Sequence, residues 1–182
     1  NQNTMRKTLH LLTTALLLCC FAAKAADQDT LHILCIGNSF SWDAVEQELA
    51  PICASAGRPI LIGNLYYGGC SLEQHYRFLD SDTAAYSFRL IENGVRTIHE
   101  PYTLRQALRL CQWNYISFQQ ASHDSGIQSS YEPYLSQLID SVRIYQPQAQ
   151  LCWLQTWSYS QEATHPAFPR YAQSQSIMND SI

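Results

Sequence analysis

The sequence has 182 residues, of which 46% are hydrophobic and 14% charged, a balance typical of one soluble globular domain rather than a disordered or fibrous chain. Its formal net charge of −4 at pH 7 gives no reason to expect a nucleic acid or an anionic membrane surface as a partner. We find no internal repeat, no low-complexity tract and no block of like charges.

The first 25 residues are predicted to be a secretory signal peptide. Met5 is interpreted as the natural start, and residues 1–4 as an upstream extension of the reading frame. The following residues have the order of a cleaved signal: a basic pair at 6–7, an apolar run over 9–21 and a small-residue cleavage site at 23–25. The run is shorter than the roughly 20 residues that a spanning helix needs. We therefore expect a secreted or periplasmic protein without a stable membrane span.

The seven cysteines give no sign of a metal site or a disulfide framework. Anchoring as a lipoprotein through Cys19 or Cys20 is less favoured, because neither follows Gly, Ala or Ser. Removal of the signal would leave an odd number without C-x-x-C spacing: Cys35, Cys53, Cys70, Cys111 and Cys152. One disulfide stays open, without an assigned pair, and we expect no metal and no cofactor.

Strand-like and helix-like segments alternate along the rest of the chain. In chain order we expect a strand at 31–36, a helix at 42–56, a strand at 60–66, a short helix at 72–79, a hairpin over 85–100, a helix at 103–111, a strand at 115–119, a helix at 131–145 and a strand at 150–156. The hairpin is predicted from Asn93-Gly94 in an alternating stretch. Strands alternating with helices indicate an α/β fold with a mostly parallel sheet covered on both faces.

Candidate functional residues follow the predicted strands. In sheets of this kind ligands bind beyond the carboxyl ends of the strands. The segments there hold Asn38-Ser39, Gly68 to Ser71, Gln119-Gln120 and Trp157. Gly, Asn and Ser are also ordinary turn residues, but their convergence on one edge of the sheet favours a chemical role.

Ser39 is the candidate nucleophile. A serine hydroxyl attacks an acyl carbon only when a base accepts its proton and donors stabilise the oxyanion. The start of a helix favours negative charge at Ser39. Its backbone N–H, the Gly69 backbone and the Gln119 side-chain amide are candidate oxyanion donors, because glycine permits a close backbone approach.

Three stretches resemble the SGNH (GDSL-type) hydrolases, in a secreted and largely uncharacterised bacterial branch. They are "IGNSFS" at 36–41, "YYGGCSLEQH" at 66–75 and "WNYISFQQAS" at 113–122, and the similarity extends over residues 31 to about 180. The resemblance implies a three-layer α/β/α flavodoxin-like sandwich and a serine esterase without a metal, often one that deacylates carbohydrates. By position Ser39 matches the nucleophile, Gly69 the oxyanion glycine and Gln119 the third-block amide.

The sequence departs from that family pattern in three places. Asn38 stands where many members have Asp, and Gln119 stands where most have Asn. The Asp-x-x-His that supplies the base near the C-terminus of the family is absent from that part of this sequence. Since "YAQSQSIMNDSI" at 171–182 is typical of a helix without a stop signal, we expect the domain at 26–182 to be truncated at its C-terminus.

The remaining candidates have weaker support. His75 is interpreted as a structural or pocket residue, and His123 and His165 are weak candidates for a base. We expect the following side chains as pocket residues: Asn38, Trp42, Cys70, His75, Gln120 and Trp157.

We expect a secreted esterase that cleaves acyl, chiefly acetyl, esters on a small molecule or glycan. Two alternatives remain open. One is a non-catalytic glycan-binding or surface module that retains the hydrolase fold, and the other, less favoured, is a thiol enzyme that uses Cys70.

Overall fold

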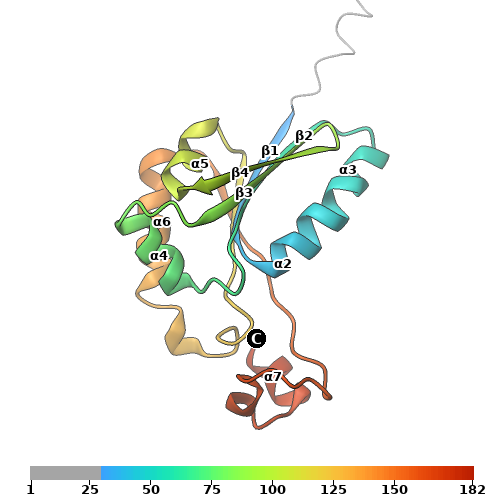
Figure 1. Cartoon of the computed structure of the whole chain (residues 1–182), viewed down its shortest axis with the longest axis vertical. Coiled ribbons are helices and arrows are strands. Elements are labelled where there is room, and N and C mark those ends of the chain that lie inside the picture. The colour runs from blue at the N-terminus through green and yellow to red at the C-terminus, as the bar shows by residue number, and fades with distance from the viewer. Residues whose placement is uncertain (1–29) are drawn as a thin grey trace, which may run out of the picture. The chain divides into compact units, whose positions relative to one another are not determined.

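A mixed α/β fold with a six-stranded sheet organises residues 30–182, the part of the chain that the computed structural model describes (Figure 1). The predicted signal peptide and upstream extension lie outside these residues. The strands are β1 (Leu31–Gly37), β2 (Ile60–Tyr66), β3 (Tyr86–Glu92), β4 (Val95–Tyr102), β5 (Tyr115–Phe118) and β6 (Gln150–Trp153). The helices are α2 (Ser39–Ser41), η1 (Trp42–Leu49), α3 (Ala50–Ser55), α4 (Leu72–Asp80), α5 (Leu104–Leu110), η2 (Gln128–Ser130), α6 (Tyr134–Tyr145), η3 (Phe168–Tyr171) and α7 (Gln175–Ser181).

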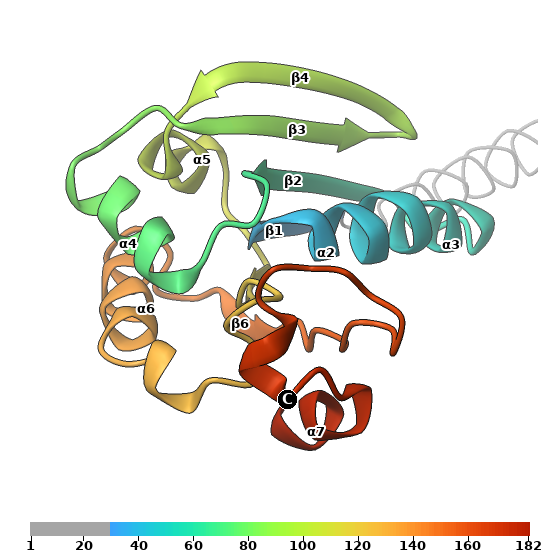
Figure 2. The same ribbon diagram turned by 60° about the horizontal axis from the view of Figure 1, so that its bottom comes forward.

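The order of the strands in the sheet is β4-β3-β2-β1-β5-β6. Strands β2, β1, β5 and β6 are parallel, and the β3–β4 hairpin joins β2 in antiparallel pairing (Figure 2). The hairpin turns at Asn93-Gly94, where both residues have positive φ (50° and 76°), as a two-residue turn of type I′ requires. The mostly parallel α/β sheet is therefore confirmed, and so is the position of the hairpin.

Helices cover the two faces of the sheet because the chain crosses it in two directions. The connection from β1 to β2 runs one way, whereas the connections from β2 to β5 and from β5 to β6 run the other way. Right-handed crossovers then place α2–α3 on one face and α4, α5 and α6 on the opposite face, as Figure 1 shows. We call these the α3 face and the α6 face. Alternate residues of β1 divide between them: Leu34 and Ile36 belong to the core of the α6 face, and Cys35 to that of the α3 face.

The helix after β1 starts earlier than the sequence predicts. It starts at Ser39 because the Asn38 side chain caps it by accepting a hydrogen bond from the Phe40 N–H (3.2 Å). From there it runs without interruption to Ser55. Residues 42–49 within it adopt π-helical geometry, which is rare and is often found at functional sites.

Other predicted boundaries shift by a few residues. Helix α6 begins at Tyr134 rather than at 131, directly after Pro133. Strands β5 and β6 end at Phe118 and Trp153, so Gln119 stands just beyond its strand.

The C-terminal segment forms a small cluster of its own. Phe168, Tyr171 and Met178 from η3 and α7 are buried against one another. Among the described residues no helix is both long and apolar enough to cross a membrane.

Candidate functional site

Ser39 is exposed at the carboxyl end of the central strand β1, as the first residue of the following helix. Gly37 permits the sharp turn, since a Cβ at this position would lie 2.2 Å from the Ser41 Oγ. Next to it Asn38 is 1% exposed. A solvent-accessible hydroxyl therefore stands on a rigid, buried turn at the start of a helix.

The Asn38 carboxamide connects the three stretches that the sequence singled out. Its Nδ2 donates to the carbonyls of Cys70 (3.0 Å) and Gln120 (3.3 Å), and its Oδ1 accepts from the Gln119 Nε2. The segments after β1, β2 and β5 thus meet around one buried amide. This explains how Asn serves at a position where the related pattern often has Asp: two of these three bonds are donated to carbonyls, and an ionised Asp has no hydrogen to donate.

Gly69 lies in the loop between β2 and α4 with a φ of 66°, a conformation that favours glycine. A Cβ at Gly69 would meet no atom within 4 Å, so the backbone borders open space. Ser71 then starts α4 as its N-cap by accepting from the Gln74 N–H (3.3 Å). The C-terminal end of the loop is consequently fixed by α4, while Gly69 itself remains exposed.

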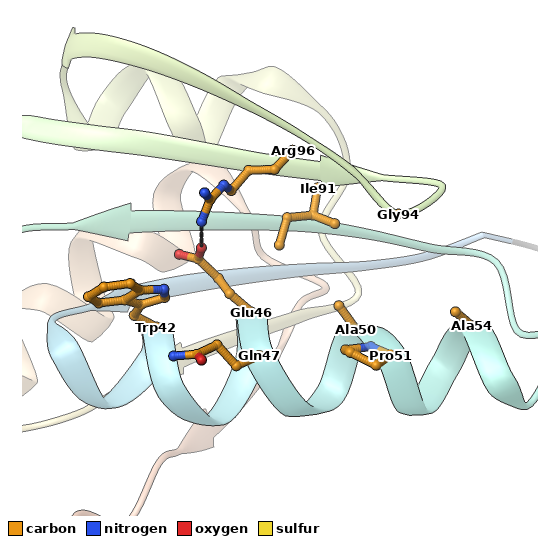
Figure 3. A pocket seen from close by; sticks show the side chains of 9 residues that line it. All are labelled: Trp42, Glu46, Gln47, Ala50, Pro51, Ala54, Ile91, Gly94 and Arg96. Carbon is orange, nitrogen blue, oxygen red and sulfur yellow. Dashed lines mark hydrogen bonds and ion pairs between the residues drawn. The ribbon is translucent and has the colours of Figure 1, made fainter.

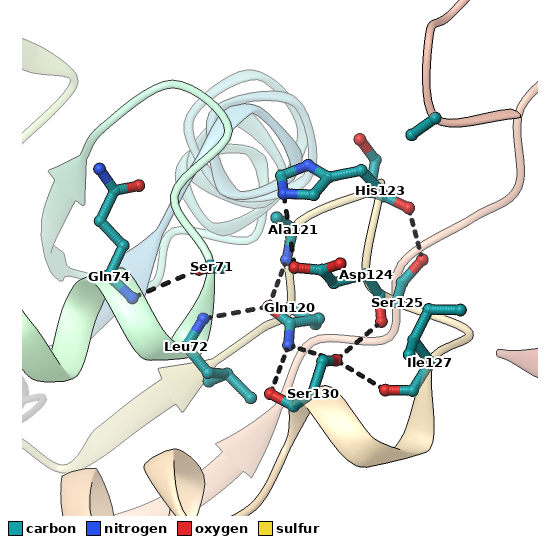
Figure 4. Close-up of polar contacts among 12 residues, drawn as sticks. Ser71, Leu72, Gln74, Gln120, Ala121, His123, Asp124, Ser125, Ile127 and Ser130 are labelled. Carbon is teal, nitrogen blue, oxygen red and sulfur yellow. Dashed lines mark hydrogen bonds and ion pairs between the residues drawn. The ribbon is translucent and has the colours of Figure 1, made fainter. Parts of the chain in front are cut away.

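Gln119 and Gln120 have different environments. Gln119 is buried beside Gly37, and one N–H of its amide goes to Asn38, while its Oε1 has no hydrogen-bond partner. The Gln120 Oε1 accepts from the Leu72 N–H (3.0 Å), and its Nε2 donates to Ser130 (Figure 4). Gln120 is therefore buried and links α4 to the segment after β5 by hydrogen bonds. It is not part of an open pocket surface.

Two exposed tryptophans flank the start of the helix. Trp157 packs edge-to-face on Phe40 with ring centroids 4.2 Å apart, and Trp42 packs in the same manner on Tyr66 at 6.0 Å. Their exposed fractions are 49% and 38%. Two partly exposed aromatic side chains therefore lie near the start of the helix that carries Ser39.

A hollow of about 420 Å³ adjoins the loop that holds Gly69. Its walls come from the ends of β2, β3 and β4: Tyr66, Tyr67, Gly68, Ala85, Tyr86, Ser87, Glu100 and Pro101.

His75 and Cys70 lie in the interior. Both are 0% exposed. The His75 Nδ1 and the Tyr86 hydroxyl form a hydrogen bond of 2.8 Å, and the two rings stack. Burial lowers the pKa of His75 to about 3 and raises the pKa of the Cys70 thiol. Both side chains are therefore neutral and enclosed by the core, and their roles are structural. We do not assign either of them to the pocket, and a buried, protonated thiol such as that of Cys70 is a poor nucleophile.

The loop histidines have local partners. The His123 Nε2 lies 3.4 Å from the Asp124 carboxylate (Figure 4). Arg170 also binds this carboxylate. His165 stacks on Tyr159 and accepts from the Ala167 N–H at its Nδ1. The structure gives no contact between either imidazole and Ser39.

The sequence analysis missed a set of polar residues behind the site: Ser41, Asn64 and Glu46, which are buried, and the half-buried Arg89. Ser41 is part of the "GNSFS" stretch, but nothing in the spacing indicates that its hydroxyl would point inward. No group of three or more His, Cys, Asp or Glu side chains in the described region is arranged to hold a metal ion.

Comparison with known proteins gives a family and two structural relatives. Residues 32–182 match the model of a domain of unknown function, DUF4886. A crystal structure of a DUF4886 family protein from Bacteroides uniformis is 42% identical with a TM-score of 0.82, and the match covers 85% of this chain. This chain spans only 60% of that relative's length. No curated protein matches.

The second relative shares the fold at low sequence identity. It comes from Slackia heliotrinireducens and is assigned by inference to the SGNH hydrolases, with 19% identity and a TM-score of 0.53. The match covers 84% of this chain and 70% of that one. The α/β architecture is accordingly similar to that of an SGNH hydrolase.

Proposed function

This chain belongs to the DUF4886 family, whose description gives no function, and we propose that it carries the nucleophile of a serine ester hydrolase of the SGNH type. Ser39 Oγ attacks the carbonyl carbon of an ester, the alcohol leaves with a proton, and water then releases the acid from the acylated serine. One observation carries the proposal: Ser39 is exposed on a turn that the buried Asn38 ties to the loops after β2 and β5.

We propose that three groups around this turn stabilise the oxyanion. The Ser39 N–H stands in the first turn of a helix, where the backbone N–H groups have no partner within the helix and the helix dipole favours negative charge. Gly69 follows in the loop bonded to Asn38, and the Gln119 Nε2 has a second hydrogen besides the one given to Asn38. Loss of one such donor typically raises the barrier by about 3 kcal/mol.

The substrate we propose is an acyl ester, chiefly an acetyl ester, on a carbohydrate outside the cytoplasm. Exposed Trp42 and Trp157 are suited to stack on a sugar ring, and the hollow beside Gly68 offers space for it. The resemblance assigns the base to an Asp-x-x-His block, and we propose that a segment outside these 182 residues supplies it in the full-length protein.

The test uses the natural full-length protein with 4-nitrophenyl acetate and a fluorophosphonate probe. Ser39→Ala is expected to remove turnover and labelling, whereas Ser55→Ala, an exposed serine at the end of α3, leaves both intact. Unchanged turnover in the Ser39 variant would refute the assignment. Binding of an acetylated oligosaccharide without any turnover would instead support a glycan-binding module.

A further inference from the structure

A chain of buried polar side chains runs from the turn at Ser39 into the sheet. The Ser41 hydroxyl lies 2.9 Å from the Asn38 carbonyl and 2.9 Å from the Asn64 Oδ1. The Asn64 Nδ2 in turn donates to the Glu46 carboxylate at 2.6 Å. Ser41 and Asn64 are 0% exposed, and the Glu46 side chain is 2% exposed. Three consecutive polar groups are thus withdrawn from water directly behind the proposed nucleophile.

Two arginines from the hairpin hold the far end of this chain. Arg89 on β3 and Arg96 on β4 lie 3.5 Å and 3.4 Å from the two Glu46 oxygens, and Figure 3 shows the Arg96 pair between hairpin and helix. Arg89 is also stacked on the Tyr66 ring, 3.8 Å from its centroid. The Glu46 carboxylate is therefore fixed in position by the sheet and not only by its own helix.

The direction of the hydrogen bonds follows from the charge on Glu46. A carboxylate only accepts hydrogen bonds, so it selects the amino end of the Asn64 amide. The Asn64 oxygen then has to face Ser41, and Ser41 has to be the donor. The single hydroxyl hydrogen of Ser41 is held between the Asn64 oxygen and the Asn38 carbonyl. That carbonyl belongs to the peptide bond that carries the Ser39 N–H.

The position of Glu46 in the helix also needs a reason. Glu46 lies within the π-helical residues 42–49 and is turned toward the sheet beside apolar Val45. A buried carboxylate is expensive to desolvate, and apolar replacements of similar volume are often at least as stable. Core stability alone therefore does not account for this arrangement.

We propose that Ser41, Asn64 and Glu46 are positioning residues that fix the peptide between Asn38 and Ser39 for catalysis. This inference rests on the proposed function. The three side chains touch no substrate and act through the orientation of the turn. Their loss is expected to lower kcat, whereas KM changes little, because the aromatic faces that would bind the substrate stay in place.

A double-variant cycle in the full-length protein tests the proposal. Asn64→Asp places a carboxylate against Glu46, and kcat for 4-nitrophenyl acetate is expected to fall on the order of 10²-fold, the typical effect of a small misplacement. Adding Glu46→Gln restores a donor opposite the new Asp, whose other oxygen accepts from Ser41. The double variant is therefore expected to regain kcat to within about threefold, and Glu46→Gln alone completes the cycle.

A matched control separates positioning from stability. Gln146→Met removes another buried amide, at the end of α6. This amide donates to the carbonyls of Leu108 and Cys111. We expect it to lower the melting temperature without changing kcat. If Asn64→Asp does not fold, Ser41→Ala interrupts the same chain by one oxygen atom, and the same fall in kcat is expected.

The outcomes distinguish the two proposals. A wild-type protein that neither turns over the ester nor reacts with the fluorophosphonate refutes the proposed function and the positioning role together. An active wild type with unchanged kcat in a folded Asn64→Asp variant overturns the positioning role alone. The positioning role is also overturned if Asn64→Asp lowers kcat and the addition of Glu46→Gln fails to restore it.

Discussion

The two faces of the sheet differ in how completely the described helices cover them. On the α6 face, α4, α5 and α6 enclose a large core that includes Leu34, Leu108 and Leu138, each 0% exposed. On the α3 face the core is smaller and centres on Val45 and Ile62. A groove of about 340 Å³ lies next to this smaller core.

The groove exposes part of a parallel sheet. Its walls are Leu31, Ile33, Cys35, Val45, Leu49, Tyr115, Ser117, Cys152, Trp153 and Leu154. Parallel strands are normally buried on both faces. The α3 face, which carries the groove, is therefore less well covered from solvent than the α6 face. The proposed nucleophile lies on the helix of the α3 face, whereas most of the packing that stabilises the sheet lies on the other face.

The largest expected difference between the faces is in the free energy of unfolding. Leu138→Ala on α6 removes a fully buried side chain and is expected to lower this free energy by about 3 kcal/mol. Leu49→Ala removes a half-buried side chain at the groove, with an expected loss of about 1 kcal/mol. Urea unfolding of both variants measures the difference, and equal losses would show that the faces contribute alike.

Acid should weaken the α6 face through His75. Because burial holds the pKa of His75 at about 3, against an ordinary value of 6.5, the unfolded chain binds a proton that the folded chain does not. The contribution of the neutral His75 to the free energy of unfolding is then fully present above pH 6.5. It declines as the pH falls toward 3, by at most about 1.4 kcal/mol per pH unit.

The His75→Phe variant isolates this effect. Its unfolding free energy should vary less than that of the wild type between pH 6.5 and 5, a window above the ordinary pKa values of carboxyl groups. Chemical denaturation at several pH values gives both curves. Parallel curves would show that another group causes the acid sensitivity.

The sequence predicted the features that depend on local pattern. The Asn93-Gly94 turn needs two residues with positive φ, and this dipeptide supplies them. The meeting of the loops that hold Ser39, Gly69 and Gln119 follows from parallel topology, since the strand ends share one edge. These predictions required only chain order and backbone chemistry.

The features that depend on side-chain direction were not predictable. The strand 31–36 is almost uniformly apolar, so its sequence does not show that Ile33 borders a groove while Leu34 is fully buried. Glu46 looks like a solvated residue of a helix, because its partners Arg89 and Arg96 lie more than 40 residues further along the chain. His75 is in an amphipathic helix, and only the packing of α4 decides that it faces Tyr86.

The smallest effect is a difference in thiol reactivity that leaves the fold intact. Cys35 and Cys152 both line the groove, but Cys152 is partly exposed, whereas Cys35 is 1% exposed and burial raises its pKa to about 11. Since the thiolate is the reactive form, a maleimide at pH 7.5 is expected to modify Cys152 well before Cys35 in a protein of residues 30–182. Peptide mass mapping at successive times gives both rates, and equal rates would contradict the difference in burial. The same measurement on the longer protein that we propose sharpens the comparison: if Cys152 becomes as unreactive as Cys35 there, further chain covers the groove on the α3 face in that protein.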